Sequence, residues 1–213
     1  MAALIRPRPP VDLLGMEGTL TARPFRPAPD LAAWLFAAFI DEGAPLANQD
    51  HEHLREAAID CLWVAIPRSQ GGHGVAAQAE RLALQGNKWT KARQEQQLEE
   101  WFGRLPDFLL TFHADYADVV DDATFCALVE HELYHCAQER DAFGAPKFSK
   151  TTGRPLFTIR GHDVEEFVGV VARYGVGAAA GQTRALVEAA NRPPLVASAA
   201  IAGCCGTCGR AVV

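Results

Sequence analysis

The chain of 213 residues lacks any apolar run that approaches the roughly 20 residues of a membrane-spanning helix. Its longest candidate, residues 195–202, is too short and rich in alanine. The N-terminus has only a brief apolar stretch before a run of prolines, so it lacks the hydrophobic centre of a signal peptide. We therefore expect a cytoplasmic protein with no membrane partner.

Positive charge is scarce as well. Twenty Lys and Arg residues stand against 26 Asp and Glu residues, which gives a formal net charge of −6. No stripe of lysine or arginine offsets this balance, so we expect no nucleic-acid partner. The Gly-rich stretch at residues 69–76 is not followed by Gly-Lys-Ser/Thr, which excludes a phosphate-binding loop of that type. The sequence indicates no oligomeric state.

Six cysteines are too few for a disulfide framework, and they are unevenly placed. Three of them, Cys61, Cys126 and Cys136, lie inside apolar patterns and are expected to be reduced core thiols. The other three, Cys204, Cys205 and Cys208, crowd the last ten residues and resemble half of a zinc knuckle. Because no second pair lies nearby, we expect exposed thiols in a tail. A metal site shared between chains and a redox pair are the alternatives.

Three segments are expected along the chain: a Pro-rich flexible arm at residues 1–29, a domain at 30–176, and a helix with an Ala/Gly/Cys-rich tail at 177–213. The predicted helices cover residues 30–43, 50–58, two stretches within 76–102, 121–140, 162–175 and 182–190. The predicted strands cover residues 61–66, 107–112, 147–149 and 156–160. In this order the chain begins with helices and continues with strands that lie on either side of further helices. Such an order predicts an α+β fold.

The sequence His-Glu-Leu-Tyr-His at residues 131–135 is the candidate metal-binding motif of the chain. Its two histidines are four residues apart, so on a helix they lie on one face and both can reach one tetrahedral zinc ion. Glu132 stands beside the first ligand, where its carboxylate can reach a water on the metal. An apolar stripe through Cys126, Val129, Leu133 and Cys136 predicts the buried face of this helix and places the His-Glu-His face away from it.

A catalytic zinc needs a third protein ligand and one open position. The next cluster downstream is Gly-His-Asp-Val-Glu-Glu-Phe at residues 161–167. We expect His162 to be the third ligand, with Glu165 and Glu166 as the alternatives. A carboxylate that does not bind the metal could orient a ligand histidine through a hydrogen bond. Asp163 is a further candidate for this role.

These motifs together resemble the putative phage metallopeptidase family. The resemblance covers roughly residues 30–176 and is carried by residues 131–136, 141–148, 161–167 and 173–175, with weaker support from Asn48, residues 50–54 and residues 62–64. More remotely, the pattern is similar to SprT-like zinc proteases, in which a downstream histidine completes a three-histidine site. That carries over to His162, although this chain has one residue more between the histidine and the following Phe167.

The resemblance implies a small zincin-like fold, in which a short mixed sheet packs on the helix of residues 131–135 and on a second ligand-bearing helix. It also implies a Zn²⁺ cofactor, a protein or peptide substrate, and an origin in a phage or prophage. Glu132 would act as general base towards a water activated by zinc. Tyr174, with Arg173 and His113 as alternatives, would donate to the developing oxyanion.

Some roles near the site stay open. The strand at residues 108–112 could lie beside the metal and pair with an extended substrate. Tyr134 is expected to pack, and His51 and His53 to cap a helix or to pack at the surface. Two other functions are consistent with the motif: a catalytically silent zinc-binding regulatory module, and a DNA-associated protease of the SprT-like type. The acidic charge balance weighs against the second.

Overall fold

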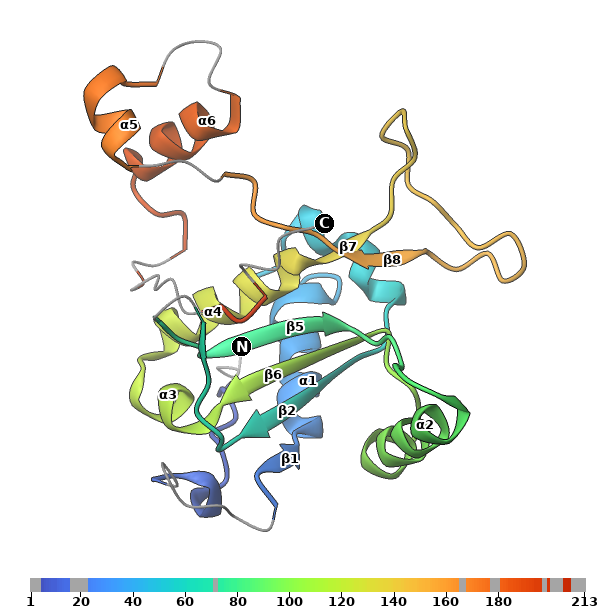
Figure 1. The fold of residues 1–213 in the computed structure, drawn as a ribbon. Helices are drawn as coiled ribbons and strands as arrows, with labels where there is room; N and C mark the ends of the chain where they lie inside the picture. The colour runs from blue at the N-terminus through green and yellow to red at the C-terminus, as the bar shows by residue number, and fades with distance from the viewer. Residues whose placement is uncertain are drawn as a thin grey trace. The chain divides into compact units, whose positions relative to one another are not determined.

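The computed structural model describes residues 5–15, 23–70, 73–164, 168–176, 181–196, 199 and 205–207 (Figure 1). The chain divides into two compact units. The first comprises Met1–Arg160 and Ala199–Val213, and the second comprises residues 161–198. All the strands of the described residues belong to the first unit.

A mixed four-stranded sheet forms the centre of the first unit, in the order β1-β2-β6-β5 (Figure 1). Its strands are β1 (Phe25–Pro27), β2 (Ile59–Val64), β5 (Ala77–Arg81) and β6 (Phe108–His113). The central pair, β2 and β6, is parallel, and each outer strand is antiparallel to its neighbour. Helices combined with this mixed sheet confirm the α+β class.

The expected strands at residues 61–66 and 107–112 correspond to β2 and β6, whereas β5 occupies a stretch for which a helix was expected. That expectation was wrong. In β5 the residues alternate between two faces: Ala77 and Ala79 are buried, and Gln78 and Glu80 are half-buried. This period of two follows from the pairing with β6, which overrides the helix-favouring composition of the segment.

One face of the sheet carries the main core. Here α1 (Pro29–Leu35) packs on β2, and α4 (Asp122–His135) packs on β5. The ring of Phe125 on α4 lies 5.5 Å from Phe112 and 6.1 Å from both Trp63 and Trp34, measured between centroids. These aromatic contacts join both helices to the sheet and fix the position of α4.

Shorter elements complete the first unit. They are the 3-10 helices η1 (Val11–Leu13) and η3 (Gln49–Glu56), the π-helical turn η2 (Phe36–Ile40), α3 (Ala114–Val119), and the small strands β3 (Ser69–Gln70) and β4 (His73–Gly74). On the other face of the sheet, α2 (Lys88–Phe102) packs Leu98 against Leu62 and Leu109.

α4 begins and ends at identifiable residues. The carboxylate of Asp121 accepts a hydrogen bond from the backbone N–H of Thr124 at 2.8 Å, which caps the helix at its start. The helix ends at His135, earlier than the expected end near residue 140. The reason is that the next three residues form β7 (Cys136–Gln138), which pairs with β8 (Phe157–Ile159).

The second unit contains α5 (Val168–Tyr174) and α6 (Gly181–Ala190). Residues 161–164 are not helical, so His162 precedes the helix that was expected to open near it. Among the described residues, no helix has both the length and the apolar character that crossing a membrane requires.

Candidate metal centre

The last turn of α4 brings two imidazole nitrogens together. The Nε2 atoms of His131 and His135 lie 3.2 Å apart, and the ring centroids are separated by 5.0 Å. Two ligands of a tetrahedral zinc ion, each about 2.0–2.1 Å from the metal, would be about 3.3–3.4 Å apart. The spacing of the two nitrogens therefore fits a shared zinc ion.

His135 is oriented by the backbone of Arg160. The Nδ1 atom of His135 lies 2.7 Å from the carbonyl oxygen of Arg160, and the N–H of Arg160 donates to the carbonyl oxygen of His135 at 3.0 Å. A carbonyl oxygen can only accept, so Nδ1 carries the proton. In the neutral ring Nε2 then holds the lone pair that a metal needs.

Glu132 is completely buried, although the sequence placed it on the polar side of the helix. Its Oε2 atom accepts a hydrogen bond from the Thr207 hydroxyl at 3.2 Å, while its Oε1 atom has no hydrogen-bond partner among the described residues. Burial raises the pKa of Glu132 to about 7, against the opposite effect of hydrogen bonds from Cys205, Thr207 and the backbone of Ala79. A buried oxygen without a partner beside two convergent nitrogens fits a centre that holds a metal and a water.

Cys205 is the residue that sequence reasoning missed. Its Sγ atom lies 3.3 Å from Nε2 of His135, and its side chain is buried rather than exposed as expected. The ligand atoms of His131, Glu132 and Cys205 all lie within 4.8 Å of one another. The Cys-x-x-Cys spacing hinted at a metal, but no local pattern connects the tail with a helix 70 residues earlier.

Other residues predicted for the site belong to the second unit. His162 is exposed there, and Tyr174 ends α5, where its side chain lies outside what the structure describes. Glu165 and Glu166 lie outside the described residues. The roles assigned to these four residues stay predictions.

The strand next to the metal helix is β5 and not β6. In the sheet order β6 lies between β2 and β5, so both of its edges are already paired with other strands (Figure 1). The expectation that residues 108–112 offer an edge to a substrate is therefore wrong. β5 is the edge strand, and α4 packs against it.

A polar cluster supports the other side of α4. The hydroxyl of Tyr134 donates to a carboxylate oxygen of Asp50 at 3.0 Å and accepts from the amide of Asn48 at 2.8 Å. The ring of His51 meets that of Tyr134 at 4.7 Å, and Nε2 of His53 donates to the carbonyl oxygen of Cys136 at 2.8 Å. Tyr134 packs as expected, and His53 binds the carbonyl oxygen of the residue that follows α4. His51 is buried, whereas capping or packing at the surface was expected.

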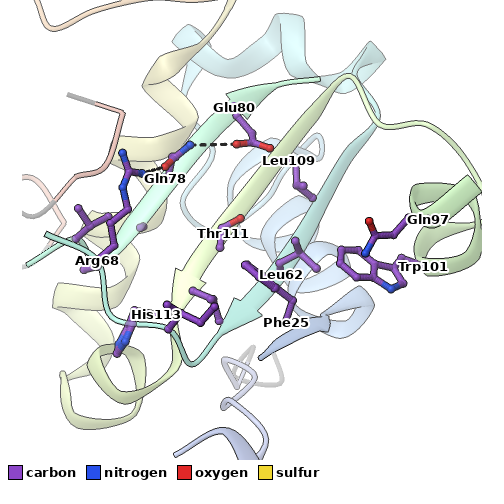
Figure 2. A pocket seen from close by; sticks show the side chains of 15 residues that line it. Phe25, Leu62, Arg68, Gln78, Glu80, Gln97, Trp101, Leu109, Thr111 and His113 are labelled. Atoms are coloured by element: carbon purple, nitrogen blue, oxygen red, sulfur yellow. Dashed lines mark hydrogen bonds between the residues drawn. The ribbon is translucent and has the colours of Figure 1, made fainter. Parts of the chain in front are cut away.

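A cavity of about 480 Å³ lies on the sheet face opposite α4 (Figure 2). Leu62, Leu109 and Thr111 line it from the sheet, and Trp101 lines it from α2. His113 lines it too, so this candidate oxyanion donor faces away from the metal helix. None of the metal-ligating candidates borders the cavity, and the chemistry of the site is not located there.

The family model described as "Putative phage metallopeptidase" matches residues 32–191, which is most of the chain. Neither the curated proteins nor the solved structures provide a match.

Proposed function

The chain belongs to the putative phage metallopeptidase family, and we propose that it is a zinc-dependent peptidase with Glu132 as general base. The observation that carries this proposal is the arrangement at the end of α4. Two histidine Nε2 atoms converge at 3.2 Å, and beside them lies a buried carboxylate, one oxygen of which has no partner within the described part of the chain.

His131 and His135 would hold the zinc ion through their Nε2 atoms. We propose His162 as the third ligand because the chain passes His135 at Arg160 and continues to His162 two residues later. Two residues span at most about 7 Å, so an imidazole at this position is within reach of the two nitrogens. Glu165 and Glu166 remain the alternatives.

When bound, zinc would lower the pKa of a coordinated water to about 7 and polarise a peptide carbonyl. Oε1 of Glu132 would take a proton from that water and pass it to the leaving amine. The hydroxyl of Tyr174 would donate to the oxyanion, and Tyr174→Phe is expected to lower kcat more than it raises KM.

The substrate would be an extended peptide. We propose that it pairs with β5, because β5 is the sheet edge beside α4. Pairing with an edge strand binds the peptide backbone and leaves alternate side chains free for selection. This assignment replaces β6 in the substrate role.

The test compares Glu132→Gln with Glu130→Gln, two residues earlier on the same helix. A general base contributes about 10²–10⁴-fold to the rate, so Glu132→Gln should lose peptidase activity by that factor while it keeps its zinc. Glu130→Gln should keep both activity and zinc. A Glu132→Gln variant as active as the unmodified chain would contradict the proposal.

A second variant addresses the third ligand. His162→Ala should lose zinc, as His131→Ala and His135→Ala should. Retention of zinc in His162→Ala would reassign the third position to Glu165 or Glu166. A chain that holds zinc but cleaves no protein substrate, even when Cys205 is replaced by Ser, would instead be a silent zinc-binding module. Micromolar binding of duplex DNA at physiological salt would favour the DNA-associated protease.

A further inference from the structure

A short segment near the C-terminus, residues 205–207, lies along the edge strand β5. Cys205 forms a parallel bridge with Ala77, and the N–H of Gly206 donates to the carbonyl oxygen of Ala77 at 2.6 Å. The hydroxyl oxygen of Thr207 accepts from the N–H of Ala79 at 2.8 Å and lies 3.0 Å from the carbonyl oxygen of Ala79. The segment thus pairs with the strand that we propose for the substrate.

The same segment carries a thiol into the metal centre. Sγ of Cys205 lies 3.3 Å from Nε2 of His135 and within 4.8 Å of a carboxylate oxygen of Glu132. Independently of the cysteine, the Oε1 atom of Glu132 is buried at this point without a partner among the described residues. Two imidazole nitrogens and a sulfur that converge on one point form a donor set suited to zinc.

We propose that Cys205 is a ligand of the same metal ion and that residues 205–207 close the active site from within the chain. The proposal rests on the proposed function, because it concerns the same metal. The sulfur takes the position that a peptidase keeps open, its proton passes to solvent, and the water that it replaces is released. The chain with its tail in place is then a latent enzyme.

Gly206 permits this close approach. A Cβ atom at Gly206 would lie 2.6 Å from Cγ1 of Val75 and 3.1 Å from the carbonyl oxygen of Ala77. An added side chain therefore requires Val75 or the segment itself to shift, and a branched side chain is expected to push the segment away from β5. Gly206→Val should detach the segment while every cysteine of the chain is kept.

The test uses the full-length protein loaded with cobalt(II) in place of zinc. A cobalt–thiolate bond gives an intense charge-transfer absorption in the near ultraviolet, which nitrogen and oxygen ligands do not give. We expect this band in the unmodified chain and its loss in Cys205→Ser, with cobalt still bound. Cys126→Ser, on α4, and Cys208→Ser, in the same tail, are matched controls that should keep the band.

Gly206→Val is the second variant and should also lose the band. Its control is Gly74→Val, at a nearby glycine where an added Cβ meets no atom within 4 Å. A band that persists in Cys205→Ser, or its absence from an unmodified chain that holds one cobalt ion, overturns the proposal and leaves the proposed function standing. A chain that binds no cobalt overturns both. Circular dichroism of each variant verifies that it is folded.

Discussion

At the scale of single residues, hydrogen bonds to the backbone of Arg160 orient His135. The backbone N–H of Arg160 donates a hydrogen bond to the carbonyl oxygen of His135. The backbone carbonyl oxygen of Arg160 accepts a hydrogen bond from Nδ1 of His135. Both contacts use main-chain atoms, which any residue other than proline at position 160 would supply. The type of residue at position 160 therefore could not reveal this role in the sequence.

His51 should make stability depend on pH. It is 1% exposed, and burial lowers its pKa from 6.5 to about 4, assisted by repulsion from His53 and Arg160 and opposed by Asp50. The unfolded chain takes up a proton below pH 6.5, whereas the folded chain does not until about pH 4. Stability should therefore fall as the pH is lowered through this window, by about 2 kcal/mol between pH 7 and pH 5.

Urea unfolding of the metal-free protein at the two pH values measures this effect. Glu130, whose carboxylate lies 3.9 Å from Nε2 of His51, is too distant for a hydrogen bond. In His51→Phe the part of the pH dependence that is due to this residue should disappear. An equal loss of stability in His51→Phe and in the unmodified chain would show that His51 is not its source.

Residue-level reasoning from the sequence could find the histidine pair and Glu132, because the spacing in a helix is a local property. It could not find the burial of Glu132 or the placement of Cys205. Both depend on the tail segment lying on β5, a contact between residues more than 120 positions apart. No periodicity within the tail encodes that contact.

At the scale of elements, α4 depends on its cap. Asp121 accepts a hydrogen bond from the N–H and another from the hydroxyl of Thr124. Asp121→Ala should lower the free energy of unfolding by about 1 kcal/mol, the usual effect of losing such a cap. Urea unfolding measures it, with the exposed Glu95→Ala on α2 as a control that should change little. Equal stabilities for the two variants would refute the capping role.

The elements that the sequence predicted well are those with a continuous apolar run or a clear cap, namely β2, β6 and α4. The prediction failed at β5, whose residues Ala-Gln-Ala-Glu-Arg favour a helix when considered alone. Hydrogen bonds to β6 and the packing of Ala77 and Ala79 on the core decide that conformation. Such tertiary constraints are not readable from a short window of sequence.

At the scale of the whole first unit, distant parts of the chain contact α4 at both of its ends. Near the helix start, Arg6 donates to the carbonyl oxygen of Val120 at 2.7 Å, pairs with Asp122 at 2.8 Å, and lies over the ring of Phe125 at 4.4 Å. Near the helix end, residues 205–207 contact Glu132 and His135.

Arg6→Ala should therefore lower the free energy of unfolding by about 1–3 kcal/mol, because it removes a buried charged hydrogen bond and a cation–π contact. The matched variant is Arg8→Ala. Arg8 also reaches Asp122, but its side chain is 50% exposed, so we expect its loss to cost less than about 1 kcal/mol. Thermal or urea unfolding of the two variants checks the difference. A larger loss for Arg8→Ala would contradict this assignment.

Removal of the Cys205 sulfur from the metal centre should activate the enzyme. Cys205→Ser removes the sulfur from the metal centre and leaves His131, His135 and Glu132 in place, so cleavage of an unfolded protein substrate should increase several-fold. The same assay on Cys208→Ser should give the activity of the unmodified chain. A fall in activity in Cys205→Ser would show that the tail supports catalysis and does not block it.

The central claim is that His131 and His135 hold a zinc ion. The most direct test is the zinc content per chain of the purified protein beside His131→Ala, His135→Ala and the control His53→Ala. We predict one tightly held zinc ion per chain in the unmodified protein and in His53→Ala, and its loss in the other two variants. No zinc in the unmodified protein, or equal zinc in all four proteins, would contradict the claim.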